Sequence, residues 1–149
     1  RFYKHGKSYV ACSGGKDSLA LTHLIVHNID PDVPVFHWNH GKWLIPKQIE
    51  NDILNCIKSI PVKNLIIRTY RFGEVSEKSR INYVKWYRTF YKTIEELNKE
   101  FKFEICFLGL RAEESITRRR RTRKYHEFHK GTGTTLVYPL RDWSWLDVW

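Results

Sequence analysis

The sequence predicts a doubly wound α/β domain, with a mainly parallel sheet of about five strands and helices on both of its faces. Three observations indicate this fold. Short apolar runs alternate along the chain with longer segments of helical periodicity. The runs are continuously apolar rather than alternating, which is typical of parallel strands covered on both faces. The chain has 149 residues, enough for one domain of ordinary size.

The first half of the chain contains three predicted strands and two predicted helices. Residues 9–12 are a β-prone run, and residues 18–28 carry leucines at helical spacing. A second strand at 33–40 precedes a helix at 46–59, whose first residue is a proline, as suits a first helical turn. Residues 64–70 form the third strand.

The second half is less regular. Residues 71–92 are expected to begin as a loop and to become helical towards their end. A capping box then opens a helix at 93–101. The fourth and fifth strands are predicted at 104–110 and 134–140, and a second capping box starts a helix at 144.

The composition and the two ends of the chain lead to expectations about its cellular setting and its domain boundaries. No run approaches the roughly 20 apolar residues of a membrane helix, so we expect a cytoplasmic domain with no membrane partner. The chain starts at Arg1, contains no methionine and stops where a helix begins. We therefore expect residues 1–149 to be a single domain, truncated at both ends from a longer protein.

The cysteines predict no cluster or bridge. Cys12, Cys56 and Cys106 lie far apart and form no C-x-x-C pair, which argues against a disulfide framework, a zinc site or an iron-sulfur cluster in this span. Each borders or interrupts an apolar run, so buried structural thiols are expected.

One junction between strand and helix, here called the anion loop, reads Ser13, Gly14, Gly15, Lys16, Asp17, Ser18. Its glycines permit positive φ and close backbone approach, so that successive N–H groups can point into one concavity. The helix that follows adds its positive N-terminal end, Lys16 adds a full charge, and the serines add hydroxyls. These features predict a phosphate or sulfate site, because a turn capped by Asp17 or Ser18 needs neither the lysine nor both serines.

The anion loop resembles the PP-loop of the adenine nucleotide alpha-hydrolase-like superfamily. Two further stretches, "GLRAEESITRR" from Gly109 and "YPLRDWSWLDVW" from Tyr138, resemble the corresponding segments of the phosphoadenosine phosphosulfate (PAPS) reductase family. The three stretches occur in the family's order, so the resemblance spans nearly the whole chain. It implies an enzyme with a single PP-loop nucleotide-binding domain of the predicted fold.

The resemblance implies the site residues. All six residues of the anion loop match the family's anion-binding loop, and its G-x-R-x-x-E-S-x-x-R segment is matched by Gly109, Arg111, Glu114 and Arg118. There the glycine allows the nucleotide to approach, and the arginines face its anionic end. We expect the nucleotide to contact these residues and the catalytic work to fall to Lys16, Arg111 and Arg118.

Arg121 is also expected to bind the nucleotide, and Asn39, His40 and Asp142 are expected to support the site. A helix beginning near Glu113 would place Glu114, Arg118 and Arg121 on one face, although the first two could form only a helix salt bridge. Asp142 is similar to the family's aspartate before a tryptophan, with helix capping as its alternative role.

The resemblance implies a reaction. A PAPS reductase presents the sulfuryl group of PAPS to a cysteine thiolate, and sulfite is released after reduction by thioredoxin or glutaredoxin, with no metal required. A homo-oligomer is expected. The family's cysteine lies in a C-terminal Glu-Cys-Gly-Leu-His segment that this chain does not contain, and none of its three cysteines stands in for it.

A second departure keeps another reaction open. The family usually carries an acidic residue and Thr-Gly after the second strand, whereas this chain has Asn39 and His40 before Gly41. The wider superfamily instead splits ATP with Mg²⁺ between the α and β phosphates and passes the AMP moiety to an acceptor, as in sulfate adenylylation or DNA phosphorothioation. Lys16 would then stabilise the pyrophosphate leaving group.

Nucleic-acid binding is a hypothesis of another class. The net charge is +10, and residues 118–124 read RRRRTRK. Aromatic residues stand among the charges at Tyr83, Trp86, Tyr87, Phe90 and Tyr91, although their helical spacing favours core packing.

The sequence contains two weaker patterns, which are two pairs of histidines and one pair of glycines. His126 with His129, and His37 with His40, could be read as metal-binding pairs on one helix face, but neither has an acidic or cysteine partner nearby in sequence, so we expect no metal site. Gly131 and Gly133 suggest a mobile loop that closes over a ligand.

Overall fold

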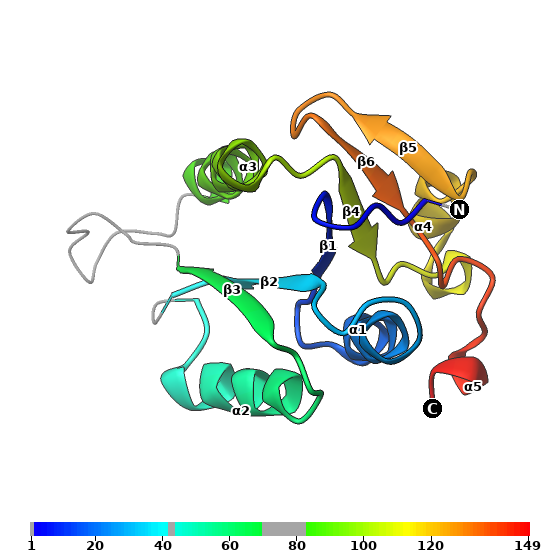
Figure 1. The fold of residues 1–149 in the computed structure, drawn as a ribbon, viewed down its shortest axis with the longest axis horizontal. Coiled ribbons are helices and arrows are strands. Elements are labelled where there is room, and N and C mark those ends of the chain that lie inside the picture. The colour runs from blue at the N-terminus through cyan, green and yellow to red at the C-terminus, as the bar shows by residue number, and fades with distance from the viewer. Residues whose placement is uncertain (1, 42–43, 70–82) are drawn as a thin grey trace.

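The structure is a computed structural model that describes residues 2–41, 44–69 and 83–149. Within them lies one six-stranded sheet in the order β3-β2-β1-β4-β6-β5 (Figure 1). The strands are β1 (Ser8–Ala11), β2 (Pro34–Asn39), β3 (Asn64–Thr69), β4 (Ile105–Leu108), β5 (His126–His129) and β6 (Thr134–Val137). All neighbours pair in parallel except β5 and β6, which are antiparallel. The predicted doubly wound α/β fold is therefore confirmed.

Helices cover both faces of the sheet. They are α1 (Lys16–Asn28), α2 (Lys47–Lys58), α3 (Tyr83–Phe101), the 3-10 turn η1 (Ala112–Glu114), α4 (Ile116–Arg121) and α5 (Trp145–Val148). Figure 1 shows α1 and α2 on one face and α3 on the other. None of the helices among the described residues is long and apolar enough to cross a membrane.

Successive residues of β1, β2, β4 and β6 pack into two separate cores. On the α1 and α2 face, Val10 and Phe107 pack with Leu21, Ile25 and Ile57. On the other face, the buried residues are Tyr9, Phe36, Leu97, Phe103 and Tyr138. Burial of each such side chain stabilises the fold by about 1.5–3 kcal/mol, so both faces hold their helices firmly.

The strand order predicts a ligand crevice at β1. The chain leaves β1 for β2 on one side and later returns through β4 on the other, so β1 is the point where the winding reverses. In open parallel sheets, ligands bind beyond the carboxyl ends of the strands at such a point. The anion loop follows directly after β1 (Figure 1).

The structure corrects three sequence predictions. The strand β5 was not predicted, and it raises the number of strands from about five to six. The helix α3 begins at Tyr83, so Thr93 is no cap but lies mid-helix, where its hydroxyl donates to the Thr89 carbonyl at 2.9 Å. The amphipathic pattern simply continues upstream, and the early part of 71–92 lies largely outside the described residues.

The third correction concerns the arginine-rich segment. A continuous helix from Glu113 was expected, but η1 ends at Glu114 and α4 starts after Ser115, whose φ of −169° is extended. The Ser115 hydroxyl caps α4 by accepting a hydrogen bond from the Arg118 backbone N–H at 3.1 Å. Capping serines favour this non-helical geometry, which breaks the helix.

Candidate functional site

The two glycines of the anion loop have different backbone conformations. Gly14 has a φ of +82°, whereas Gly15 has a φ of −74° and is the N-cap of α1. Of the two glycines that permit positive φ, Gly14 therefore adopts it and Gly15 does not. The Ser18 hydroxyl donates to the Gly15 carbonyl at 2.8 Å, and the hydroxyls of Ser13 and Ser18 lie 3.2 Å apart.

The N-terminus of α1 carries no side-chain cap. The backbone N–H groups of its first turn have no acceptor within the helix, and together with the helix dipole they favour an anion. The Lys16 ammonium lies beside this end and donates to the Asp17 carboxylate at 2.9 Å. A free helix end and a lysine therefore meet at the loop, as an anion site requires.

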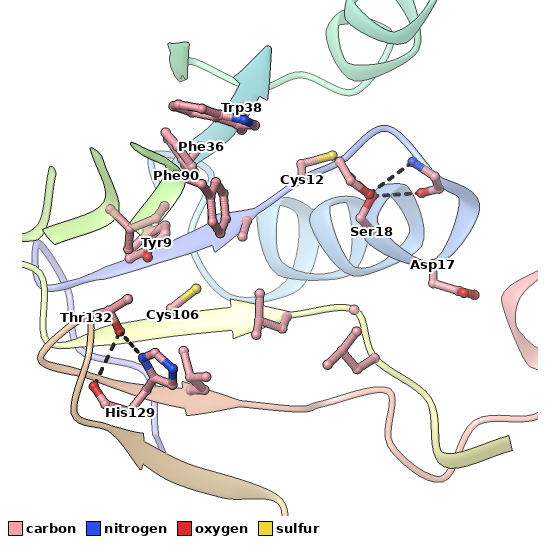
Figure 2. Close-up of a pocket in the computed structure, with 18 of the residues that line it drawn as sticks. Tyr9, Cys12, Asp17, Ser18, Phe36, Trp38, Phe90, Cys106, His129 and Thr132 are labelled. Atoms are coloured by element: carbon pink, nitrogen blue, oxygen red, sulfur yellow. Dashed lines mark hydrogen bonds between the residues drawn. The ribbon is translucent and has the colours of Figure 1, made fainter. Parts of the chain in front are cut away.

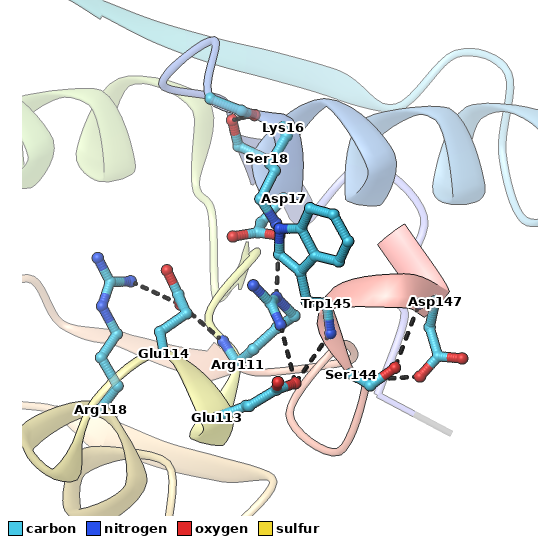
Figure 3. Close-up of polar contacts among 11 residues, drawn as sticks. Lys16, Asp17, Ser18, Arg111, Glu113, Glu114, Arg118, Ser144, Trp145 and Asp147 are labelled. Carbon is cyan, nitrogen blue, oxygen red and sulfur yellow. Dashed lines mark hydrogen bonds and ion pairs between the residues drawn. The ribbon is translucent and has the colours of Figure 1, made fainter. Parts of the chain in front are cut away.

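Arg111 contacts the anion loop from its buried side and does not line the cavity. Its side chain is buried, and Nε donates to the Asp17 carboxylate at 2.9 Å (Figure 3). Its NH1 group lies 3.3 Å from Glu113, which also accepts the Trp145 backbone N–H at 2.8 Å. Arg111 thus joins β4, α1 and α5, and it is absent from the lining of the cavity described below.

Gly109 allows two parts of the backbone to pack closely. A Cβ atom at this position would lie 2.7 Å from the Asp17 carbonyl oxygen and 3.0 Å from the Cα of Ser18. The neighbours are rigid backbone, so any side chain would push the end of β4 away from α1. The resemblance implied that this glycine lets the nucleotide approach. Close packing of the backbone against α1 is a second reason for a glycine at this position.

A cavity of about 650 Å³ opens beside the anion loop. At one part of its wall stand Ser13, Gly15, Lys16, Asp17 and Ser18. The rest is largely apolar, with Tyr9, Phe36, Trp38 and Phe90 among the lining side chains (Figure 2). A volume of this size with few polar groups is typical of small-molecule sites.

Glu114, Arg118 and Arg121 also line the cavity, so the structure brings them to the same side as the sequence predicted. Arg118 lies 3.3 Å from the Glu114 carboxylate (Figure 3), and Arg121 lies 3.9 Å from Glu127. The three residues reach the cavity although the helix between them is broken at Ser115. Two guanidinium groups and Lys16 therefore border one cavity.

Of the three predicted supporting residues, one lines the cavity and two do not. His40 lines the cavity and stacks on Trp86 with ring centroids 5.4 Å apart. Burial lowers the pKa of His40, with the nearby Glu50 opposing this shift and His37 adding to it. Asn39 instead accepts the Gly41 backbone N–H at 2.7 Å, and exposed Asp142 pairs with Arg141 at 3.0 Å. Neither Asn39 nor Asp142 is among the residues that line the cavity.

The expected burial of the cysteines holds for two of the three. Cys12 and Cys106 are buried and line the cavity, whereas Cys56 is exposed on α2. Burial raises the pKa of the Cys106 thiol to about 12, so its thiolate does not form at neutral pH.

The histidine pairs are not helical. His126 and His129 belong to a strand, where residues three apart point to opposite faces: His126 packs on Phe2, and His129 lines the cavity. In the described part of the chain, no three His, Cys, Asp or Glu side chains gather as a metal site would require. The absence of a metal site, and the mobility predicted for Gly131 and Gly133, stay predictions.

Sequence reasoning missed the support beneath the loop. Buried His37 hydrogen-bonds through Nδ1 with the Cys12 carbonyl at 2.8 Å and through Nε2 with buried Glu50 at 2.9 Å. One helical turn after Glu50, Ile53 lies under Gly14, where a Cβ atom would come within 2.4 Å of its Cγ2. A histidine inside an apolar strand and a glutamate among the isoleucines of α2 were the available signals.

Comparisons with solved structures give the fold. An FMN adenylyltransferase from Candida glabrata, in complex with ATP, matches with a TM-score of 0.58 and 16% identity, covering 97% of this chain and 45% of that one. The U34-tRNA thiolase NcsA from Methanococcus maripaludis, with its [4Fe-4S] cluster, matches with a TM-score of 0.59 and 15% identity, covering 95% and 53%. The chain thus spans about half the length of these proteins.

The comparison of sequences gives the family. No curated protein matches the chain. The family model of the phosphoadenosine phosphosulfate reductase domain, however, matches residues 7–149. That span contains the anion loop and the stretches that begin at Gly109 and Tyr138, on which the resemblance rested. The chain belongs to the phosphoadenosine phosphosulfate reductase domain family.

Proposed function

We propose that this domain binds PAPS or a closely related adenine sulfonucleotide and supports the reductive release of sulfite from it. The observation that carries the proposal is the uncapped N-terminus of α1 beside Lys16, at the edge of a largely aromatic cavity. Such a site suits a ligand with an anionic tail and a flat base. Membership of the family supports the sulfonucleotide as that ligand.

In this proposal, the residues of the chain bind the nucleotide and neutralise its negative charges. Backbone N–H groups of the anion loop and the Lys16 ammonium hold one anionic group, and Arg118 and Arg121 hold another. Arg111 makes no contact with the ligand. It is a positioning residue, because its buried guanidinium fixes Asp17 and through it the first turn of α1.

The chemical step requires a thiolate. The thiolate sulfur bonds to the sulfur of the sulfuryl group, the bond from that sulfur to the nucleotide oxygen breaks, and the bisphosphate nucleotide leaves. A thiol of thioredoxin or glutaredoxin then attacks the cysteine sulfur, forms a mixed disulfide and releases sulfite. In this proposal none of the three cysteines supplies the first thiolate, because Cys12 and Cys106 are buried and Cys56 lies on α2 away from the cavity lining.

A second candidate is adenylyl transfer from ATP, with loss of pyrophosphate from the anion loop. The burial of both cavity cysteines favours it, since this reaction uses no thiolate. A structural neighbour in complex with ATP supports it too. Mg²⁺ would arrive with ATP as part of the substrate, because the Asp17 carboxylate already pairs with Lys16 and Arg111.

Calorimetric titration separates the two candidates. PAPS, adenosine 3′,5′-bisphosphate and ATP with Mg²⁺ are titrated into the protein, into Lys16→Ala and into Lys58→Ala, an exposed lysine on α2. We expect PAPS and the bisphosphate to bind without metal and Lys16→Ala to weaken binding about tenfold or more, with Lys58→Ala unchanged.

Other outcomes have clear meanings. Binding of ATP alone, dependent on Mg²⁺ and weakened by Lys16→Ala, would replace sulfite release with adenylyl transfer. If none of the three ligands bound the folded protein, both candidates would fail. Equal losses in the two lysine variants would show that the anion loop is not the binding site.

A further inference from the structure

The cationic side chains of residues 118–124 divide into two groups. An α-helix turns about 100° per residue, so Arg118 and Arg121 share one side of α4, and Arg119 and Arg120 lie on the other. The first two line the cavity and pair with Glu114 and Glu127. The nucleotide site can therefore account for two of the cations but not for the rest.

The remaining cations form what we call the basic ridge: Arg119, Arg120, Arg123 and Lys124. All four side chains are exposed. In the described part of the chain, no carboxylate lies within ion-pair distance of any of them, although each of several other surface lysines has such a partner. Four unpaired positive charges within six consecutive residues repel one another, and a bound polyanion would relieve that repulsion.

Helix stabilisation does not explain the ridge. One or two basic residues in the last turn suffice to complement the helix dipole. The helix α4 has only six residues, with Arg118 and Arg121 already in its last turn. Arg123 and Lys124 lie beyond the end of α4, where the effect of the dipole falls off.

The aromatic residues do not join the ridge. Trp86 and Phe90 stack on each other and pack against the core beneath α3, as their helical spacing favoured. Tyr87 and Tyr91 hydrogen-bond to each other at 2.9 Å and line the cavity. The side chain of Tyr83 lies outside the described residues. A partner of the ridge is thus recognised by charge, through phosphate groups rather than stacked bases.

We propose that the basic ridge binds the sugar-phosphate backbone of a nucleic acid. One arginine guanidinium group can bind two phosphate oxygens through two parallel N–H groups. Closely spaced arginines match the regularly spaced negative charges of a phosphate backbone. The ridge shares α4 with two residues of the cavity, so a bound strand passes next to the nucleotide site. Backbone binding itself does not depend on which nucleotide the cavity takes.

The test is fluorescence anisotropy with a labelled single-stranded RNA and a labelled DNA duplex over a range of salt concentrations. The double variant Arg119→Gln/Arg120→Gln is compared with Lys47→Gln/Lys58→Gln, which removes the same net charge from exposed positions on α2. We expect the ridge variant to lose about tenfold in affinity and to lower the salt slope by about 1.4–1.8, while the α2 variant changes little.

Three results would overturn the proposal. The first is no binding of either polymer at low salt. The second is an equal loss in the two double variants, which would mean that net charge alone attracts the polymer. The third is binding to vesicles of anionic lipid in place of nucleic acid. Titration of adenosine 3′,5′-bisphosphate into the same variants shows separately whether the cavity is intact, so a failure of the nucleotide site is recognised as such.

Discussion

Gly14 and Gly15 are neighbours in the anion loop, yet only one of them requires glycine. Gly14 combines a φ of +82° with a position where a Cβ atom would lie 2.4 Å from Ile53 Cγ2. Gly15 has a φ of −74°, and its Cβ would meet the Ser13 hydroxyl at an ordinary contact distance of 3.6 Å. Positive φ and overpacking each destabilise a fold, whereas an extended backbone accepts any side chain.

We therefore expect Gly14→Ala to lower the free energy of unfolding by about 2 kcal/mol and Gly15→Ala to leave it within about 0.5 kcal/mol. Urea unfolding measures both. The double variant Gly14→Ala/Ile53→Ala, compared with Ile53→Ala alone, tests the cause, because alanine at position 53 lacks the Cγ1 and Cγ2 atoms that the new Cβ atom would meet. Equal stability of the two alanine variants would show that the loop is not held against α2.

At the scale of elements, β2 and α2 support the loop through one buried pair. The Cys12 carbonyl can only accept, so His37 Nδ1 donates to it. A proton must then lie between His37 Nε2 and Glu50 Oε1, which are 2.9 Å apart, because two lone pairs would repel. Both side chains are buried, so the pair fixes the end of β1 relative to α2.

Substitutions at Glu50 test this link. Glu50→Gln keeps a hydrogen bond, because its amide can donate to a neutral imidazole, and we expect stability close to that of the unmodified protein. Glu50→Leu leaves the His37 Nε2 buried without a partner, and we expect a loss of about 1–3 kcal/mol. Chemical denaturation monitored by circular dichroism gives both values. If the glutamine variant were as unstable as the leucine variant, a hydrogen bond would not be the cause.

At the scale of the whole molecule, the strands differ in how they are held. The central strand β1 is paired on both sides, with β2 and β4, and packs against both cores. Among the strands that the structure describes, β5 pairs with β6 alone, and Phe128 on it is 65% exposed. Local opening is easiest where few apolar contacts cover the backbone hydrogen bonds.

Hydrogen exchange should reproduce this order. We expect backbone amides of β1 and β4 to exchange slowest and those of β5 to exchange fastest among the strands, because β5 opens without disturbing either core. Mass spectrometry after exchange in native buffer measures the difference. Protection of β5 equal to that of β1 would mean that a further element covers this edge of the sheet, and it would contradict the expected order.

Much of this architecture follows from the sequence by itself. Continuous apolar runs determined the parallel sheet, because strands covered on both faces have no polar side to show. Glycine, lysine and serine after the first run predicted an anion site at the start of α1, because backbone freedom, charge and hydroxyls act locally. These features lie within a few residues of one another, so a local pattern is enough to reveal them.

Only the tertiary structure decided the rest. It placed Arg111 against Asp17, 94 residues earlier in the chain, where its side chain is buried. It joined His37 to Glu50, and it separated the arginines of the cavity from those of the basic ridge. The physical reason is that such contacts depend on which strands become neighbours and on how side chains pack between layers, and no local period in the sequence contains that information.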